Sequence, residues 1–326
     1  MKLAVVLFNL GGPDCPEAVE PFLRNLFTDP AILPLPGIFR RPLGRFIAAR
    51  RAPIAQEIYA KIGGRSPILE ETEAQARALE QALAGPGIQP RAFIAMRCWK
   101  PFSDDAVQAL ATWKPDRIVL LPLYPQYSTT TSGSSLEDWR KAAVRAGLSA
   151  PQAEIRSYPE EPGFIGSEAG LIRAALAKRR PDTIYRLLLS AHGLPKRIVS
   201  RGDPYQQQVE KSAAAIVAAL GENNLDWTIC YQSRVGPLEW IGPATDAEIR
   251  RAGGEGKALI VAPIAFVSEH SETLVELDIE YAKLARESGV PDYIRVPTVG
   301  THPGFIGGLA RLVRDAVSQI GSGGTA

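Results

Sequence analysis

VAPIAFVSEHSETLVELDIEY, residues Val261 to Tyr281, decides the fold class of this chain. The apolar run from Leu259 to Val267 predicts a buried strand, because a strand covered on both faces is continuously hydrophobic. The residues that follow predict a helix in which Glu272, Glu276 and Glu280 recur every fourth residue and therefore share one face. A buried strand that leads into a helix is the repeating unit of a parallel α/β sheet.

The three carboxylates have two readings. Like charges at this spacing repel one another weakly, and Lys283 and Arg286 downstream are typical of a solvated helix face. However, the acids begin at the C-terminal end of a predicted parallel strand, where open α/β sheets place their ligands. A row of acids at that edge suits the handling of cations or protons.

Length and composition indicate a soluble, two-domain protein. The chain has 326 residues, which is comfortable for two domains of about 150 residues each. Its net charge of +2, from 37 basic and 35 acidic residues, gives no argument for a nucleic-acid partner. The turn NLGGP (residues 9–13) lacks the third glycine of a dinucleotide fingerprint, and the chain has no GK[ST] motif, so a nucleotide is not expected. No apolar run reaches the 18 or so residues of a membrane span, and we expect a cytoplasmic protein.

The strand–helix pattern occurs twice. VVLFNLGGP (5–13) corresponds to RLLLSAHGLP (186–195), and later segments of the two halves also correspond. We therefore predict an α/β protein with two similar Rossmann-like domains, residues 1–155 and 156–326, each a doubly wound, parallel four-stranded sheet. Two such domains facing each other form a cleft.

Two terminal segments and one long insertion complete the predicted organisation. The last helix, 303–320, is expected to pack back on the first domain, and Gly321 to Ala326 to form a disordered tail. Residues 31–51, which we call the lip, contain no acid but many apolar residues and five arginines: Arg40, Arg41, Arg45, Arg50 and Arg51. Three prolines exclude a regular helix from its first half. The lip is either a loop packed on its domain, or a cover for a hydrophobic ligand that also touches an anionic membrane.

Side chains that carry chemistry are few. Of the three histidines, His192 is the best candidate, because small neighbours in a strand-end turn leave its ring uncovered. His270 fits a supporting role and His302 a turn. Histidine and glutamate facing each other across a cleft suit a general acid/base pair or a metal site. Two protein ligands are few for a resident metal but sufficient for one that passes through as substrate.

The three cysteines exclude several other sites. Cys15, Cys98 and Cys230 are far apart in the sequence and form no CxxC pair. This spacing argues against a zinc ribbon, a disulfide framework and an iron–sulfur cluster, and it favours a reduced, cytosolic compartment.

The sequence resembles the ferrochelatase family, whose members insert ferrous iron into a porphyrin. The segments that carry the resemblance span nearly the whole chain in the family's order: FNLGGP (8–13), YAKIGGRSP (59–67), LYPQYSTTTSGSS (123–135), SAHGLP (190–195), RGDPY (201–205), YQSRVGPLEWIGP (231–243) and PIAFVSEHSETLVELDIEY (263–281). The resemblance implies a porphyrin in the cleft between two Rossmann-like domains.

The resemblance also implies site residues. His192 matches the family's active-site histidine and Glu272 the glutamate across from it, and both are expected to contact the metal. Glu276 begins an acidic path that leads away from them. The positions that line or anchor the macrocycle are Leu10, Arg97, Tyr127 and Trp240. The lip matches the segment that shields the porphyrin and contacts the inner membrane.

This sequence departs from some members of the family in two respects. Leu10 cannot ligate a metal, where some members have methionine or tyrosine. The cysteine-rich extension that holds an iron–sulfur cluster in certain members is not matched, so no cluster is expected.

The expected reaction is insertion of Fe²⁺ into protoporphyrin IX to give protohaem with release of two protons, the last step of haem biosynthesis, with iron as substrate and no permanently bound cofactor. Neutral His192, with a usual pKa near 6.5, can accept the pyrrole protons while Glu272 and Glu276 handle the metal. The opposite assignment, with the metal approaching past His192, fits the sequence equally well. Arg97 is expected to pair with porphyrin propionates.

Three other functions are compatible with parts of the pattern. The nearest is a chelatase of the same fold for another metal or tetrapyrrole, such as cobalt or coproporphyrin. A non-catalytic tetrapyrrole carrier is less well supported, because a carrier needs neither His192 nor Glu272. A solute-binding protein with two facing domains is disfavoured by the lack of an export signal.

Overall fold

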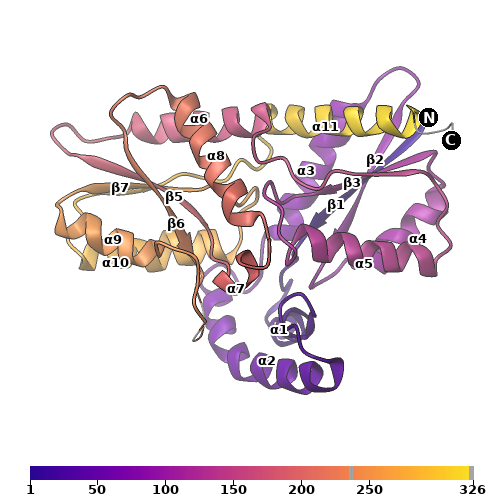
Figure 1. Cartoon of the computed structure of the whole chain (residues 1–326), viewed down its shortest axis with the longest axis horizontal. Helices are drawn as coiled ribbons and strands as arrows, with labels where there is room; N and C mark the ends of the chain where they lie inside the picture. Colours follow the sequence, from indigo (N-terminus) through magenta and orange to yellow (C-terminus); the bar gives the residue numbers. More distant parts are fainter. Residues whose placement is uncertain (235, 237, 323–326) are drawn as a thin grey trace. The chain divides into compact units, whose positions relative to one another are not determined.

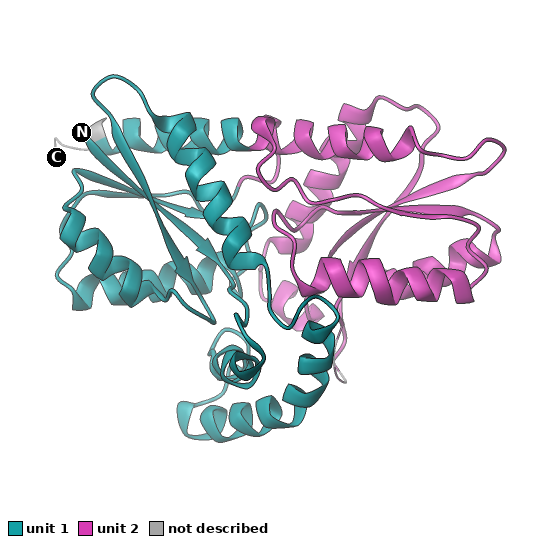
Figure 2. Ribbon diagram, turned by 180° about the vertical axis from the view of Figure 1, so that it is seen from behind, with its two compact units in different colours: residues 1–157, 306–326 teal, residues 158–305 magenta. Residues whose placement is uncertain are grey.

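The computed structural model describes residues 1–234, 236 and 238–322. The chain divides into two compact units, shown in Figure 2. Unit 1 contains Met1–Ser157 and the chain from Ile306 onward, and unit 2 contains Tyr158–Phe305. Residues 323–326 of the tail expected at 321–326 lie outside the described residues, and helix α11 (Pro303–Ser322) includes the first two.

Unit 1 is built on a sheet of four parallel strands in the order β2-β1-β3-β4. The strands are β1 (Lys2–Asn9), β2 (Gln89–Met96), β3 (Arg117–Pro122) and β4 (Gln152–Glu154). Strand β1 is buried along nearly its whole length, as a central strand covered on both faces must be. Figure 1 shows helices on both faces of this sheet: α4 (Ser103–Trp113) and α5 (Ser132–Arg145) on one, α3 (Ile68–Leu83) and α11 on the other.

One hydrophobic core of unit 1 lies between the sheet and helices α4 and α5. Its largest member, Trp139, is fully buried and meets the ring of Phe8 edge-on, with centroids 5.8 Å apart. The C-terminal helix packs in the same unit, where Arg117 Nη1 donates to the carbonyl oxygen of Val317 at 2.9 Å.

The lip is helical from Gly37 onward, while residues 31–36 form no helix, so the expectation that three prolines exclude a regular helix from its first half is corrected only in part. After η1 (Pro16–Ala18) and α1 (Val19–Thr28), helix α2 runs over Gly37–Ala60 with two prolines inside it. Each internal proline removes a backbone hydrogen bond, but packing against α1 offsets that loss. Gly44, which is buried on the side of α2 that meets α1, shows how close the helices are: a Cβ there would lie 2.6 Å from the carbonyl oxygen of Phe27.

Unit 2 has the same architecture. Its parallel strands follow the order β6-β5-β7-β8: β5 (Tyr185–His192), β6 (Asp226–Gln232), β7 (Ala258–Pro263) and β8 (Tyr293–Arg295). Helices α6 (Pro162–Leu176) and α8 (Tyr205–Leu220) lie on one face of the sheet, and α9 (Thr245–Gly254) and α10 (Ala282–Glu287) on the other, as Figure 1 shows. The short helix α7 (Lys196–Val199) follows β5. Two parallel four-stranded sheets with the same strand order confirm the predicted α/β fold class.

The stretch that decides the fold also differs from expectation in two details. Strand β7 ends at Pro263, four residues before the expected end at Val267. The following helix is a π-helix, η2 (Glu272–Tyr281), and not an α-helix. Helices of this kind are rare, usually span a single turn and frequently occur at functional sites. Among the described residues, no helix combines the length and apolar character that a membrane span requires.

Candidate active site

The candidate site lies at the C-terminal edge of the sheet of unit 2. Strand β5 ends at His192, the neighbouring strand β6 ends at Gln232, and η2 begins at Glu272. In an open parallel sheet these strand ends form the usual ligand-binding edge. The fold therefore brings together residues that are separated by up to 80 positions in the sequence.

His192 and Glu272 form the central pair. His192 Nδ1 lies 2.8 Å from Glu272 Oε2, and because a carboxylate only accepts, Nδ1 carries the proton and donates it. The second ring nitrogen, Nε2, is then the atom that can accept a proton or bind a metal. The hydroxyl of Tyr205 donates to the backbone carbonyl oxygen of His192 at 3.1 Å and fixes the end of β5.

The pair shifts both pKa values. Burial alone would lower the pKa of His192, but the charge of Glu272 and the shared hydrogen bond outweigh burial and raise it. Burial would likewise raise the pKa of Glu272, but the charge and hydrogen bond of His192 lower it to about 2. Glu272 therefore stays anionic at neutral pH and favours the protonated form of His192.

His270 supports this pair as a neutral ring. Its Nδ1 accepts the backbone N–H of Glu272 at 3.1 Å, which requires an unprotonated Nδ1 and places the ring proton on Nε2. Burial lowers the pKa of His270, in agreement with a neutral imidazole. The ring thus anchors the first residue of η2.

Glu276 is held by several donors. Its Oε1 accepts the backbone N–H of Ser233 at 2.8 Å and the hydroxyl of Tyr281 at 2.9 Å, and its Oε2 accepts from Gln232 Nε2 at 3.0 Å. Ser233 Oγ lies 2.5 Å from Glu276 Oε2 and 3.3 Å from Glu272 Oε2, so this hydroxyl stands between the two carboxylates.

The backbone of Ser233 is unusual, with φ +59°. A non-glycine residue rarely adopts this conformation, and strain of order 1–3 kcal/mol is tolerated mainly at functional sites. Here the conformation directs the amide and the hydroxyl of one residue to the same carboxylate.

Glu272 and Glu276 differ in their ionisation. Burial and the nearby charge of Glu272 raise the pKa of Glu276, even though Ser233 and Tyr281 donate to it. Glu272 is therefore the fixed anion, and Glu276 is the carboxyl that takes up a proton more readily. Opposite pKa shifts in neighbouring acids indicate different roles for them.

An ion-pair cluster around Arg295 holds η2 in place. Arg295, at the end of β8, forms a fork with Asp278 of η2 (Nε to Oδ1 2.7 Å, Nη2 to Oδ2 2.6 Å), and its Nη1 lies 2.6 Å from Oε1 of Glu269. Tyr293 also donates to the carbonyl oxygen of Leu277 at 2.8 Å. Arg295 thereby ties together two carboxylates on either side of Glu272 and Glu276.

The remaining predicted site residues fall in different places. Glu280 is exposed on η2, so the acidic row does not continue as a buried path beyond Glu276. Trp240 belongs to unit 2 and pairs with Pro195, three residues after His192; its indole N–H is buried without a hydrogen-bond partner among the described residues.

Leu10, Arg97 and Tyr127 belong to unit 1. Arg97 and Tyr127 line one pocket of about 340 Å³, and Leu10 packs instead in the core cluster around α1 and α2. Arg97 already has protein partners: Nη2 lies 2.8 Å from the buried carboxylate of Asp29 and Nε donates to Ser134 at 2.7 Å. This pairing leaves Arg97 a weaker candidate for a propionate than the sequence indicates.

Sequence reasoning missed several residues of the site. Gln232, Ser233, Tyr281 and Arg295 help to hold Glu272 and Glu276 in place. The first three lie within segments that carry the family resemblance, but the resemblance assigned them no role, and Arg295 lies outside those segments.

No group of three or more histidine, cysteine, aspartate or glutamate side chains in the described part of the chain is arranged to hold a metal ion. The cysteines are free, and Cys98 and Cys230 are buried. His192 and Glu272 could contact a metal ion together, with Glu276 behind them.

Two solved structures that share this fold are chelatases. The sirohydrochlorin chelatase SirB from Bacillus subtilis subspecies spizizenii, in complex with cobalt, has a TM-score of 0.57 and 13% identity, covering 99% of this chain and 98% of that one. CbiX, described as the terminal enzyme of sirohaem biosynthesis in denitrifying bacteria, has a TM-score of 0.52 and covers 97% of this chain and 99% of that one, at 15% identity. The fold is therefore that of the two-domain, Rossmann-like chelatases.

Sequence comparison identifies the family. The ferrochelatase family model matches residues 2–317. A ferrochelatase from Phenylobacterium zucineum is 58% identical, covering 99% of this chain and 93% of the relative, and one from Caulobacter vibrioides is 56% identical, covering 98% and 91%. The chain belongs to the ferrochelatase family. It is a metal chelatase of haem biosynthesis, with ferrous iron and a porphyrin as substrates.

Proposed function

We propose that insertion of Fe²⁺ into protoporphyrin proceeds at the edge of unit 2 where His192, Glu272 and Glu276 meet. The observation that carries the proposal is the 2.8 Å hydrogen bond between His192 Nδ1 and Glu272 Oε2. It orients Nε2 as the atom that accepts a pyrrole proton. The anionic Glu272 stabilises the imidazolium that forms, and so makes His192 a stronger base than an isolated histidine.

The proton and metal balance follows from this arrangement. A free porphyrin loses two N–H protons and gains one divalent cation, so the charge of the macrocycle is unchanged. His192 Nε2 accepts one of the two pyrrole protons. The hydroxyl of Ser233 takes up the other as it gives its own proton to Glu276, whose pKa is raised, while Glu272 attracts the cation.

The test is anaerobic insertion measured by metalloporphyrin absorbance, with His192→Ala and Glu272→Gln beside the wild type. Both substitutions should abolish rapid insertion while porphyrin remains bound. Glu280→Gln is the matched control, because it removes a carboxylate from the exposed part of the same helix. Wild-type rates in either site variant would overturn the assignment, and porphyrin binding without insertion by the wild type would favour a carrier.

Glu276→Gln separates proton handling from metal handling. If Glu276 receives protons, the variant changes the pH dependence of kcat with little effect on KM for Fe²⁺. If it guides the metal, KM for Fe²⁺ rises and the pH profile keeps its shape. The two outcomes decide between the assignments that the sequence leaves open.

Trp240 of unit 2 is expected to contact the macrocycle, and the macrocycle contacts of Leu10, Arg97 and Tyr127 stay predictions from the family resemblance. Trp240 presents an aromatic surface next to the turn that follows His192. Replacement of Trp240 by Ala should raise KM for porphyrin more than it lowers kcat, since stacking on the macrocycle serves binding.

Peripheral membrane contact through the lip is supported by helix α2. Ile38, Phe39, Leu43 and Phe46 are all exposed, and the last three recur at helical spacing on one face. Arginines lie between them, as in helices that rest on anionic membrane surfaces. Anionic lipid is the proposed partner of this face.

The vesicle test follows from the contacts of the lip. Arg40 donates to the carbonyl oxygens of Thr28 and Leu35, so it is kept. Phe39→Ser with Phe46→Ser should weaken co-sedimentation with vesicles that contain anionic lipid. Unchanged co-sedimentation would leave the lip as a packed segment of unit 1.

A further inference from the structure

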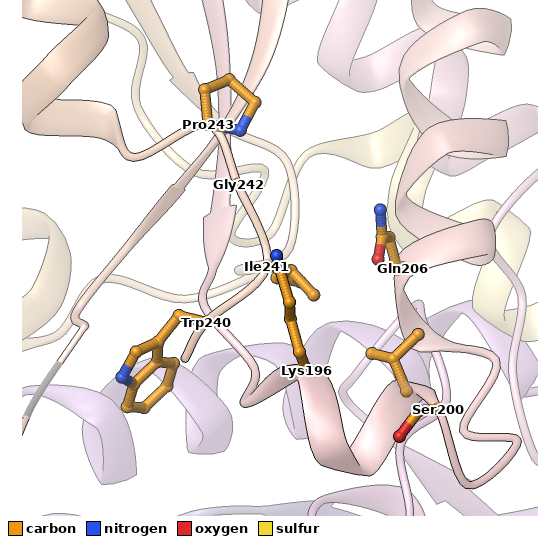
Figure 3. Close-up of a pocket in the computed structure, with 8 residues that line it drawn as sticks. Lys196, Ser200, Gln206, Trp240, Ile241, Gly242 and Pro243 are labelled. Atoms are coloured by element: carbon orange, nitrogen blue, oxygen red, sulfur yellow. The ribbon is translucent and has the colours of Figure 1, made fainter. Parts of the chain in front are cut away.

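A pocket of about 550 Å³ opens in unit 2 beside the turn that follows His192. Figure 3 shows its walls: Lys196 of α7, Ser200 directly after α7, Gln206 in the first turn of α8, and the segment Trp240–Pro243.

The backbone links the pocket directly to the candidate active site. The amide of Lys196 donates to the carbonyl oxygen of Glu239 at 2.9 Å, and the amide of Ile241 donates to that of Leu194 at 3.0 Å. The segment that carries Trp240 is thus paired with the residues that follow His192. At Gly193 a Cβ would lie 2.8 Å from the carbonyl oxygen of Gln232 and 3.2 Å from Trp240 Cε3, so the indole packs directly over the residue next to His192.

The chemistry of the lining selects an amphipathic carboxylate. Lys196 is the cation among the lining residues, and Ser200 and Gln206 are neutral polar groups. Val199, Ile241 and Pro243 are apolar, and Trp240 adds an aromatic surface. A flat apolar body with a carboxylate side chain satisfies both halves of such a lining.

Lys196 is available for a ligand. Its Nζ lies 2.6 Å from Glu239 Oε1, but the two side chains are 55% and 76% exposed. An exposed ion pair of this kind contributes little, and a ligand carboxylate can replace Glu239. Arg97 of unit 1, by contrast, is held by the buried carboxylate of Asp29.

We propose that Lys196 binds a carboxylate side chain of the tetrapyrrole, with Trp240 between this subsite and His192. This inference rests on the proposed function, because it assumes that the macrocycle occupies the edge of the sheet at His192. The subsite recognises the propionate and not the metal. It makes affinity depend on a free carboxylate, which an esterified porphyrin lacks.

The test compares protoporphyrin with its dimethyl ester, in the same detergent, by fluorescence binding and by insertion kinetics. Lys196→Met should weaken binding of the free acid by about tenfold, as expected for loss of a charge-assisted hydrogen bond, and should leave the ester unchanged. At saturating porphyrin kcat should be retained. Lys196→Arg should restore most of the affinity for the free acid.

Two further variants complete the design. Glu239→Gln removes the internal competitor and should leave binding of the free acid equal or tighter. Lys211→Met is the matched control, since Lys211 is an exposed lysine on α8 of the same unit outside the pocket lining. Melting curves of all variants report whether each is folded.

The outcomes are distinct. An equal loss for acid and ester in Lys196→Met, or no loss for either, would overturn the subsite. Because binding is measured without iron, failure of insertion in the wild type would contradict the proposed function and still leave the acid-to-ester comparison decisive for Lys196.

Discussion

Replacement of Arg295 by methionine is the sharpest test of how η2 is held. The guanidinium makes three short contacts, two to Asp278 and one to Glu269, and its side chain is only 14% exposed. Methionine keeps much of the length and removes the charge. Because removing one partner leaves the other charges buried and unpaired, the free energy of unfolding should fall by about 3–5 kcal/mol at pH 7.

The loss should depend on pH in a defined direction. In the wild type burial would raise the pKa of Glu269, but the charge of Arg295 outweighs burial and lowers it. Glu269 therefore stabilises the fold above its unfolded pKa near 4.5, and this contribution is lost as pH falls through the folded pKa. Without Arg295, burial raises the pKa, and the ionised group destabilises the fold at neutral pH. Burial, followed by the charge of Glu269, raises the pKa of the neighbouring Glu168. The gap between variant and wild type should narrow as pH falls from 7 towards 4.

Urea unfolding at several pH values measures this effect. Arg140→Met is the matched control, because Arg140 also forms a fork with a carboxylate, Glu154, but is 47% exposed. It should cost less than about 1 kcal/mol. The triple variant Glu269→Gln, Asp278→Asn, Arg295→Met should recover most of the stability. A loss below 1 kcal/mol in the single variant, or a loss independent of pH, would refute the clamp.

Three further predictions concern the site and the lip. Glu272→Gln should lower the pKa of His192, since it removes the charge that raises it; an NMR titration with an unchanged pKa would contradict the ion pair. Ser233→Gly should be more stable than Ser233→Ala by about 1 kcal/mol in thermal melts, because glycine adopts φ +59° without strain; equal stability would argue against strain there. Gly44→Ala should expose α2 to proteolysis, since its Cβ would lie 2.6 Å from a backbone carbonyl oxygen of α1, whereas Gly37→Ala should behave as wild type; equal cleavage of the two would contradict the close packing.

The strands could be predicted because burial on both faces leaves a direct mark on sequence. Strand β7 is a continuous apolar run, and β1 and β5 contain the apolar runs 3–8 and 187–189, as expected for strands buried on both faces. The same reasoning placed His192 at a strand end. The end of a parallel strand can expose a polar side chain at the ligand-binding edge of the sheet, so both the position and the residue type of His192 indicated a site.

The lip shows why a local rule failed. A proline inside a helix costs free energy because it removes a backbone hydrogen bond, and residues 31–51 contain several prolines. The compensation lies in a partner helix, where Gly44, Ala48 and Ala52 of α2 are buried. Small residues at spacing four are common in any helix, so their role was visible only once α1 was in place.

The π-helix was beyond prediction for a related reason. Its acids recur at a spacing that also fits an α-helix, and the groups that hold it come from other strands. Ser233 and Gln232 follow or end β6, and Tyr293 and Arg295 belong to β8. The ion-pair partner of Arg97 could not be predicted either, because Asp29 lies 68 positions earlier in the chain and belongs to no motif.

Electrostatics at the site connect metal arrival with proton departure. Glu272 is ionised, and its charge raises the pKa of His192, so the carboxylate favours an imidazolium next to it. A divalent cation that approaches Glu272 repels the imidazolium proton, so it lowers the pKa of His192 while it binds.

Under the proposed roles, the cation itself prepares His192 Nε2 as a neutral base at the moment when a pyrrole proton must leave. Glu276, whose raised pKa makes it the better proton acceptor of the two carboxyls, then lies one hydroxyl away from Glu272. If the proposed roles hold, metal handling and proton handling are coupled functions of one pair, and the two assignments that the sequence left open differ less than its residue pattern implied.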